Sequence, residues 1–78
     1  MRVNKAEILD LIGLKCPLPA LYARRALERA APGAMLVVLT DDPLAAIDLP
    51  HMCRQEGYLV LQSEKEGNTV RITLQRPA

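Results

Sequence analysis

The sequence contains neither tryptophan nor phenylalanine, and tyrosine occurs only twice among its 78 residues. A hydrophobic core must therefore be built from aliphatic side chains, and a composition that is 50% hydrophobic can supply them. A chain this short buries only about 60–65% of its unfolded surface on folding. The length predicts a single domain over residues 1–78 with little room for a deep substrate cavity. We therefore expect any chemistry at a surface loop or a helix end.

An excess of one charge sign is also missing, because ten Lys and Arg face nine Asp and Glu for a net charge of +1. Such a balance gives no strong field for a nucleic acid or an acidic membrane, and we expect no direct nucleic-acid binding. The sequence lacks a run of eighteen apolar residues, which excludes a predicted transmembrane helix. Lys5, Glu7 and Asp10 place charges where a signal peptide needs an apolar run. We therefore predict a cytoplasmic protein without a membrane partner.

Cysteine and histidine are scarce, with Cys16, Cys53 and His51 as the three examples. Small disulfide-stapled domains usually carry four or more cysteines, so two of them leave the redox compartment open. CxxC and HxxxH spacings are absent, and we expect neither a metal site nor another cofactor. His51 is interpreted as a solvated residue near a helix turn.

The hydrophobic pattern predicts four strands and two helices. The strands are expected at residues 8–12, 35–39, 58–63 and 69–74, and the helices at residues 20–31 and 43–56. This order is β-α-β-α-β-β, with a right-handed crossover between the first two, parallel strands and a hairpin at the end. It predicts an α+β fold, a two-layer α/β sandwich in which both helices cover one face of a mixed four-stranded sheet.

Several local features of the sequence predict where these helices begin and end and which strand residues are buried. The first strand, mostly apolar, is expected to be buried on both faces. Asp42 is expected to cap the second helix, with Pro43 as its first residue. Pro50 should kink that helix or restart it near Leu49, and Gly57 should end it. In the last strand, alternate apolar residues are expected to point inward.

The segment "GLKCPLPAL", residues 13–21, places Cys16 just before the first helix. Pro17 biases the backbone of Cys16 away from the α conformation, as a position at or before a helix cap requires. The partial positive charge of a helix start stabilises a thiolate, so we expect a lowered pKa for Cys16, with support from Lys15. The sequence thus favours a rigid, accessible and mildly activated thiol.

Two helix registers are open at this point. Either Pro17 is the first helical residue and Cys16 is the cap, or Leu18 is the cap and Pro19 begins the helix. In both, the amides of Leu18 and Ala20 are the expected partners of the sulfur. The alternative is that Cys16 is a small buried hydrophobic residue before an ordinary proline start, and the residues alone do not decide between these interpretations.

The run "LDLIGLKCPLP", followed by a helix, "PG", an aliphatic strand, "TDDP" and "DLP", resembles the TusA-like sulfur carriers, also called SirA-like or YeeD-type. The hallmark of that family is a Gly-Leu-x-Cys-Pro-x-Pro segment at the start of the first helix. The resemblance covers nearly the whole chain. It implies the β-α-β-α-β-β sandwich that the pattern also predicts.

The resemblance implies that Cys16 carries sulfane sulfur as a persulfide. The donor would be a cysteine desulfurase or a rhodanese, and the acceptor a cysteine of another protein. The relay could serve tRNA 2-thiouridine synthesis, molybdenum-cofactor supply or sulfur oxidation. The matching motif positions are Gly13, Leu14, Lys15, Pro17 and Pro19. Leu18 departs from the tRNA-thiolation members, which carry an acidic residue there.

The resemblance suggests partner docking at Arg24 and at Asp42. Asp41 and Asp42 match the acidic pair of the family before a proline, and Asp42 is also expected to be a structural cap. We expect the hydrophobic residues Leu14, Leu18 and Leu21 to contribute to a docking surface. Cys53 is interpreted as core packing. Two other functions stay open, a non-catalytic binding or regulatory module and a thiol-redox protein that uses Cys16 and Cys53.

Overall fold

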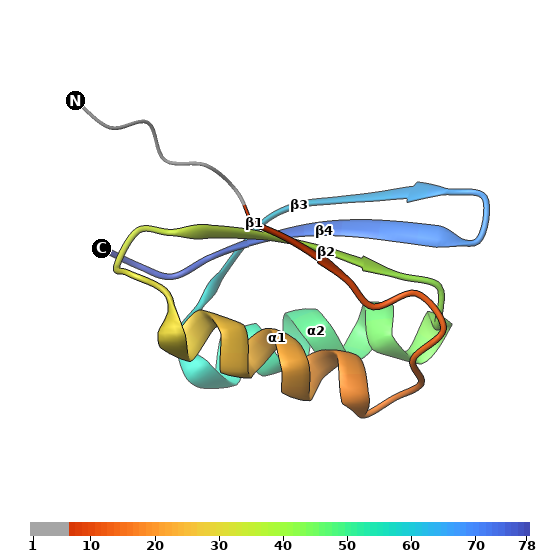
Figure 1. Ribbon diagram of the computed structural model, residues 1–78, viewed down its shortest axis with the longest axis horizontal. Helices are drawn as coiled ribbons and strands as arrows, with labels where there is room; N and C mark the ends of the chain where they lie inside the picture. Colours follow the sequence, from red (N-terminus) through yellow and green to blue (C-terminus); the bar gives the residue numbers. More distant parts are fainter. Residues whose placement is uncertain (1–6) are drawn as a thin grey trace.

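The computed structural model describes residues 7–78. Its elements are β1 (Glu7–Asp10), α1 (Leu18–Arg29), β2 (Met35–Thr40), α2 (Pro43–Glu56), β3 (Leu59–Glu66) and β4 (Thr69–Gln75). The four strands form one sheet in the order β1-β2-β4-β3, with β1 parallel to β2 and the other neighbours antiparallel. Both helices lie on the same face of this sheet (Figure 1). The predicted two-layer α+β sandwich is confirmed.

The first strand differs from the expectation. It ends at Asp10, because Ile12 and Gly13 already form a turn, and it lies at the edge of the sheet. The prediction that it is buried on both faces is wrong, since the side chain of Ile8 is 66% exposed. The register explains this exposure. Ile8 pairs with Val37 and faces away from the helices, whereas Leu9 pairs with the buried Val38 and packs against the core.

The second helix begins and ends as predicted. Asp42 is its N-cap and Pro43 its first residue, while Gly57 closes it with a φ of 83°, a left-handed conformation that suits glycine. The helix does not restart near Leu49, which was one of the two expectations at Pro50, because one helix runs from Pro43 to Glu56. The helix is buried on both sides of Pro50, at Leu49 and at Met52, and this packing outweighs the poor helix propensity of proline.

The β3–β4 hairpin is longer than the hydrophobic pattern suggested. β4 alternates as predicted, with Val70, Ile72 and Leu74 buried toward the helices. β3 continues through polar residues to Glu66, because its backbone pairs with β4 as far as Thr69. All eight residues of β3 are exposed, and those of its second half are polar. This half of the strand therefore has no hydrophobic pattern from which it could be predicted.

The core lies between the sheet and the two helices and is aliphatic, as expected. Its largest fully buried aliphatic side chains are Leu27 of α1, Leu49 of α2, and Val38, Ile72 and Leu74 of the sheet. Each helix contributes one stripe of side chains to this layer, and the opposite helix faces are left to solvent. Within residues 7–78, neither helix is long and apolar enough to cross a membrane.

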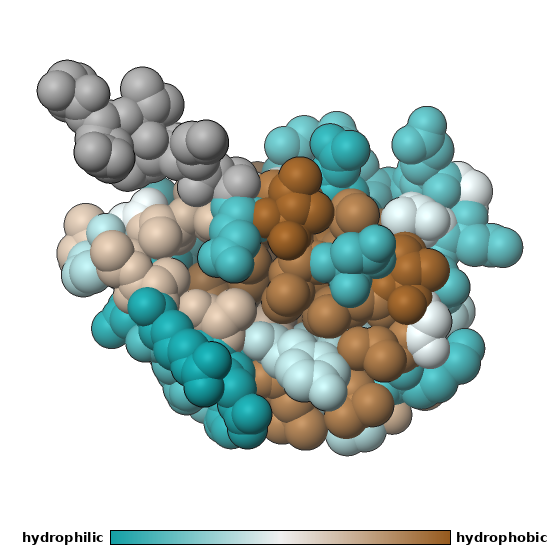
Figure 2. Space-filling view, in the orientation of Figure 1, coloured by the Kyte–Doolittle hydropathy of each residue, from teal (hydrophilic) through white to brown (hydrophobic). Residues whose placement is uncertain are grey.

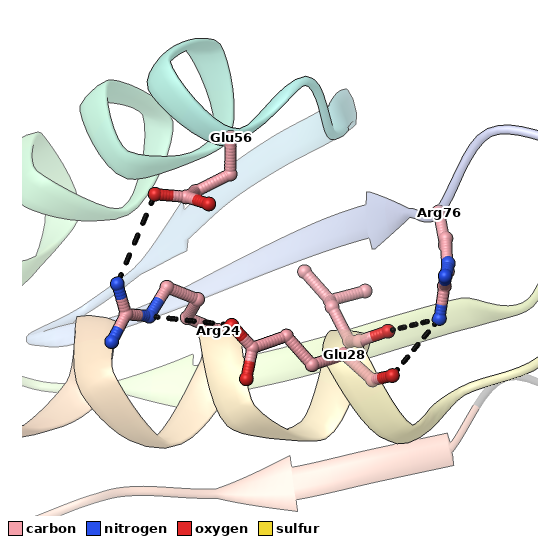
Figure 3. Close-up of polar contacts among 5 residues, drawn as sticks. Arg24, Glu28, Glu56 and Arg76 are labelled. Carbon is pink, nitrogen blue, oxygen red and sulfur yellow. Dashed lines mark hydrogen bonds and ion pairs between the residues drawn. The ribbon is translucent and has the colours of Figure 1, made fainter.

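Arg76, which follows β4, joins the end of the chain to α1. Its guanidinium Nη1 donates hydrogen bonds to the carbonyl oxygens of Leu27 (3.3 Å), Glu28 (2.9 Å) and Ala30 (2.7 Å). Figure 3 shows Arg76 reaching the last turn of the helix from the neighbouring chain end. A cation at this place supplies donors to carbonyls at the end of the helix, of which that of Leu27 also accepts the amide of Ala30 at 3.2 Å. It also complements the negative end of the helix dipole.

Candidate functional site: the Cys16 loop

The loop between β1 and α1 is shaped by two aspartates. Gly13 adopts a φ of 91°, which strongly favours glycine over residues with a side chain. Its amide donates to Asp41 Oδ1 at 2.9 Å, and the amide of Ile12 donates to Asp10 Oδ1 at 3.1 Å. The glycine of the motif is therefore required by backbone conformation, and Asp41 ties the loop to the segment between β2 and α2.

Asp42 joins the beginnings of the two helices. Its Oδ1 accepts the amide of Leu44 at 3.1 Å, and its Oδ2 accepts the amide of Cys16 at 2.6 Å. Its own amide donates to Thr40 Oγ1 at 3.2 Å. The bond from the Cys16 amide, with smaller contributions from the Leu44 amide and the charge of Lys15, lowers the pKa of Asp42 although desolvation opposes this. Asp42 is buried, which fits the cap and argues against a role as a docking residue.

The register of α1 falls between the two that the sequence left open. Pro17 is the N-cap, without a side-chain cap, and Leu18 is the first helical residue. The amide of Leu18 was expected to be a partner of the sulfur. It donates instead to the carbonyl of Lys15 at 2.9 Å, so this expectation is wrong. Pro19 lies in the first turn, where proline is tolerated, and its ring is fully buried. The second proline of the motif is therefore a core residue as well as a helix starter.

The sulfur of Cys16 has a partner on α2. The thiol donates a hydrogen bond to Asp48 Oδ2, although 32 residues separate the two in sequence. This bond, followed by desolvation and by the negative charges of Asp48 and Asp42, raises the pKa of Cys16 above its ordinary value. The prediction of a lowered pKa is wrong. A carboxylate in contact with the sulfur outweighs the partial charge of the helix start.

Sequence reasoning did not include Asp48 among the candidate residues. A signal for it was nevertheless present, because Asp48 stands alone in the apolar stretch "AAIDLP". A carboxylate that is half-buried among aliphatic residues needs a polar partner, and the chain offers the Cys16 thiol. The identity of that partner depends on how α2 packs beside the loop, which the local sequence does not specify.

Exposed apolar side chains surround the start of α1. Leu18, Leu21 and Tyr22 are 41%, 47% and 45% exposed, and Ile12 in the preceding turn is 43% exposed. Figure 2 shows hydrophobic side chains gathered over the end of the molecule where α1 begins. Leu14, which was expected to contribute to the same docking surface, is half-buried and packs against the core. We call Ile12, Leu18, Leu21 and Tyr22 the apolar rim.

Arg24 lies one turn beyond this rim. Its guanidinium pairs with Glu28 of the same helix and with Glu56 at the end of α2, both at 3.8 Å (Figure 3). Such exposed pairs stabilise a fold only weakly, because solvent screens them. Arg24 is therefore in contact with acidic groups of its own chain, and its role toward an acidic partner stays a prediction.

Cys53 differs from Cys16 in its access to solvent. Its side chain is fully buried on α2 within the core, whereas Cys16 is partly exposed. Burial raises the pKa of Cys53 to about 11. This environment agrees with the interpretation of Cys53 as core packing. Across residues 7–78, the structure contains no cluster of three or more His, Cys, Asp or Glu side chains arranged to hold a metal ion.

The profile of the family described as "Sulfurtransferase TusA" matches residues 7–76, from the first strand past the last. This chain belongs to the TusA family. Cys16, the loop that holds it and both helices all lie within the matched range, so the resemblance inferred from the cysteine-proline motif is confirmed.

Relatives and solved structures agree with this assignment. A protein of Neisseria meningitidis serogroup A, described as "Putative sulfur carrier protein NMA0882", is 39% identical over 70 residues, which are 90% of this chain and 95% of the relative. A serogroup B protein of the same description, NMB0681, matches with the same values. The crystal structure of a SirA-like protein from Desulfitobacterium hafniense superposes with a TM-score of 0.78 at 28% identity, over 91% of this chain and 97% of that one.

Proposed function

We propose that this TusA-family protein is a sulfur carrier that accepts sulfane sulfur on Cys16 as a persulfide and passes it to a cysteine of a partner protein. The observation that carries the proposal is the position of Cys16. It is the partly exposed cysteine of the chain, just before α1, and residues of the apolar rim lie on both sides of it in the sequence, Ile12 before it and Leu18 two residues after it. The family assignment and the names of the relatives support the same class of function.

The surroundings of Cys16 suit transfer between proteins. Thiol–persulfide exchange needs a sulfur that a second cysteine can reach, rather than an enclosed pocket for a small substrate. A cavity of about 210 Å³ lies beside α2 and the β3–β4 hairpin, lined by residues that include Asp41, Lys65 and Val70 but not Cys16. We propose that the donor is the persulfide of a cysteine desulfurase or a rhodanese. The acceptor would belong to tRNA thiolation, molybdenum-cofactor supply or sulfur oxidation.

A loading experiment tests this function. The protein is incubated with a cysteine desulfurase and cysteine, and with a rhodanese and thiosulfate, and its intact mass is measured. We expect a gain of one sulfur atom, which peptide mapping places on Cys16. An unchanged mass with every donor would instead favour a binding or regulatory module. A disulfide between Cys16 and Cys53 in place of the added sulfur would favour a thiol-redox protein.

A second prediction concerns docking. Leu18 is 41% exposed and lies two residues after Cys16, so a partner that reaches the sulfur would cover it. The change Leu18→Gln is expected to slow sulfur loading roughly fivefold to tenfold, because it removes about 1 kcal/mol of apolar burial from the encounter. The measurement is the initial rate of loading at a donor concentration below saturation.

The matched control is Leu59→Gln. Leu59 is 46% exposed at the start of β3, which follows the far end of α2, so it presents a similar apolar surface away from Cys16. Both variants should lose similar, small amounts of stability, about 1 kcal/mol at most, since each side chain is roughly half exposed. Equal loading rates for the two variants would contradict a docking role for Leu18.

A further inference from the structure

Cys16 is held at two points by one helix. Its amide donates to Asp42 Oδ2 at 2.6 Å, and its thiol donates to Asp48 Oδ2. Asp42 is the cap of α2 and Asp48 lies within α2, so both carboxylates belong to the same rigid element. The position of Sγ is therefore fixed relative to α2 as much as relative to its own loop.

The two carboxylates have different tasks. Both oxygens of Asp42 accept backbone amides, from Cys16 and from Leu44, so this residue shapes the backbone. Asp48 contacts the sulfur itself, and a carboxylate beside a thiol favours the protonated form of that thiol. The charged groups around Cys16 are Asp42 and Asp48 from α2 and Lys15 from its own loop. The pKa of Cys16 is raised above its ordinary value, first by the hydrogen bond to Asp48, then by desolvation, and last by the negative charges of Asp48 and Asp42.

We propose that Asp48 is the proton-holding catalytic residue of the carrier: it keeps the Cys16 thiol protonated in the free protein and accepts that proton when Cys16 attacks a donor persulfide. This inference rests on the proposed function and deepens it. The thiolate is the form that oxidants and small electrophiles attack, so a protonated Cys16 is protected while the carrier is unbound.

The transfer step balances without an added oxidant or reductant. The Asp48 carboxylate takes the proton of the Cys16 thiol, and Sγ bonds to the outer sulfur of the donor persulfide, which keeps its hydrogen. The sulfur–sulfur bond of the donor breaks, and its inner sulfur leaves as a thiolate. That thiolate takes the proton from Asp48, which returns to the carboxylate. Cys16 ends as a persulfide and the donor cysteine as a thiol.

The pH dependence of alkylation tests the protecting role without any donor protein. Wild type and Asp48→Asn are treated with iodoacetamide from pH 6 to pH 10, and the labelled Cys16 peptide is quantified by mass. Because a raised pKa leaves less thiolate at neutral pH, removal of the carboxylate should speed alkylation at pH 7. A thiolate of lower pKa is also a weaker nucleophile, and this offsets about threefold of each tenfold gain in thiolate concentration. We therefore expect a net increase in the alkylation rate of about threefold or more.

Glu28→Gln serves as the matched control. It removes one negative charge while keeping the side-chain shape, and it lies ten residues beyond the start of α1, about 15 Å along the helix axis. Its alkylation profile should coincide with that of wild type. If Asp48→Asn does not fold, the pH dependence of alkylation of Cys16 in the wild-type protein tests the protecting role. A midpoint below the ordinary cysteine value of about 8.5 would overturn the protecting role, as would coincident profiles of Asp48→Asn and wild type.

Sulfur loading tests the proton acceptor. Asp48→Asn is expected to load from a desulfurase persulfide roughly tenfold or more slowly than wild type, despite its faster alkylation, because general base catalysis is lost. Loading as fast as wild type would overturn this role. If wild type itself accepts no sulfur while the alkylation profiles differ as expected, the carrier function fails and the control of the thiol by Asp48 still holds.

Discussion

The change Cys16→Ser is expected to abolish sulfur loading entirely. A hydroxyl cannot form a persulfide, and the second thiol of the chain lies in the core with its pKa raised to about 11 by burial, so it offers almost no thiolate at neutral pH. The loop should keep its shape, because the hydrogen bond to Asp42 comes from the backbone amide of residue 16. Intact-mass measurement after incubation with a desulfurase and cysteine gives the result directly.

The control for this loss is Cys53→Ala. Truncation of a fully buried cysteine costs about 1–2 kcal/mol of stability, yet it leaves Cys16 and its two aspartates in place. This variant should gain one sulfur atom at nearly the wild-type rate at a temperature where it is folded. Retained loading in Cys16→Ser, or loss of loading in folded Cys53→Ala, would show that the sulfur does not reside where we propose.

The largest expected effect on stability comes from Leu27→Ala. Leu27 is fully buried on the face of α1 that packs against the sheet, so its truncation removes apolar burial and leaves a cavity. Such changes cost about 2–5 kcal/mol. A chain of this length has a free energy of unfolding of roughly 4–12 kcal/mol, and the variant is expected to lose a large part of it. Urea unfolding followed by circular dichroism measures the loss.

Leu21→Ala is the matched control, since it makes the same chemical change on the same helix at a side chain that is 47% exposed. Its free energy of unfolding should fall by about 1 kcal/mol at most, because half of that side chain is already in water. If both variants lost the same amount, the packing of α1 against the sheet would differ from the structure described above.

Local chemistry made most of the fold predictable. Asp42, Pro43 and Gly57 indicated the two ends of α2, and β4 alternated with the period of a half-exposed strand. These signals act over a few residues, so the sequence displays them directly. The position of Cys16 just before α1 was predictable for the same reason, since the motif is continuous in the chain. Its partial exposure was one of two interpretations that the residues left open. The end of α1 was less well predicted, since the helix ends at Arg29, before Pro32 and Gly33.

The errors arose where distant segments meet. The helix dipole next to Cys16 is a local effect and predicted a lowered pKa. The pKa is instead raised by the hydrogen bond to Asp48, which packing brings from 32 residues away. Pro50 continues a helix because the core holds both of its flanks, and the length of β3 follows from pairing with β4. In each case a tertiary contact overrides a local preference.

The double use of Asp42 has a consequence for genetics. One carboxylate caps α2 and anchors the backbone of the sulfur loop, so a single codon influences folding and chemistry together. A mutational screen that scores only survival would place Asp42 in the same class as Cys16, although both of its oxygens bind amides. Phenotype alone would thus misread a scaffold position as a reactive one, and abundance would need to be scored beside activity.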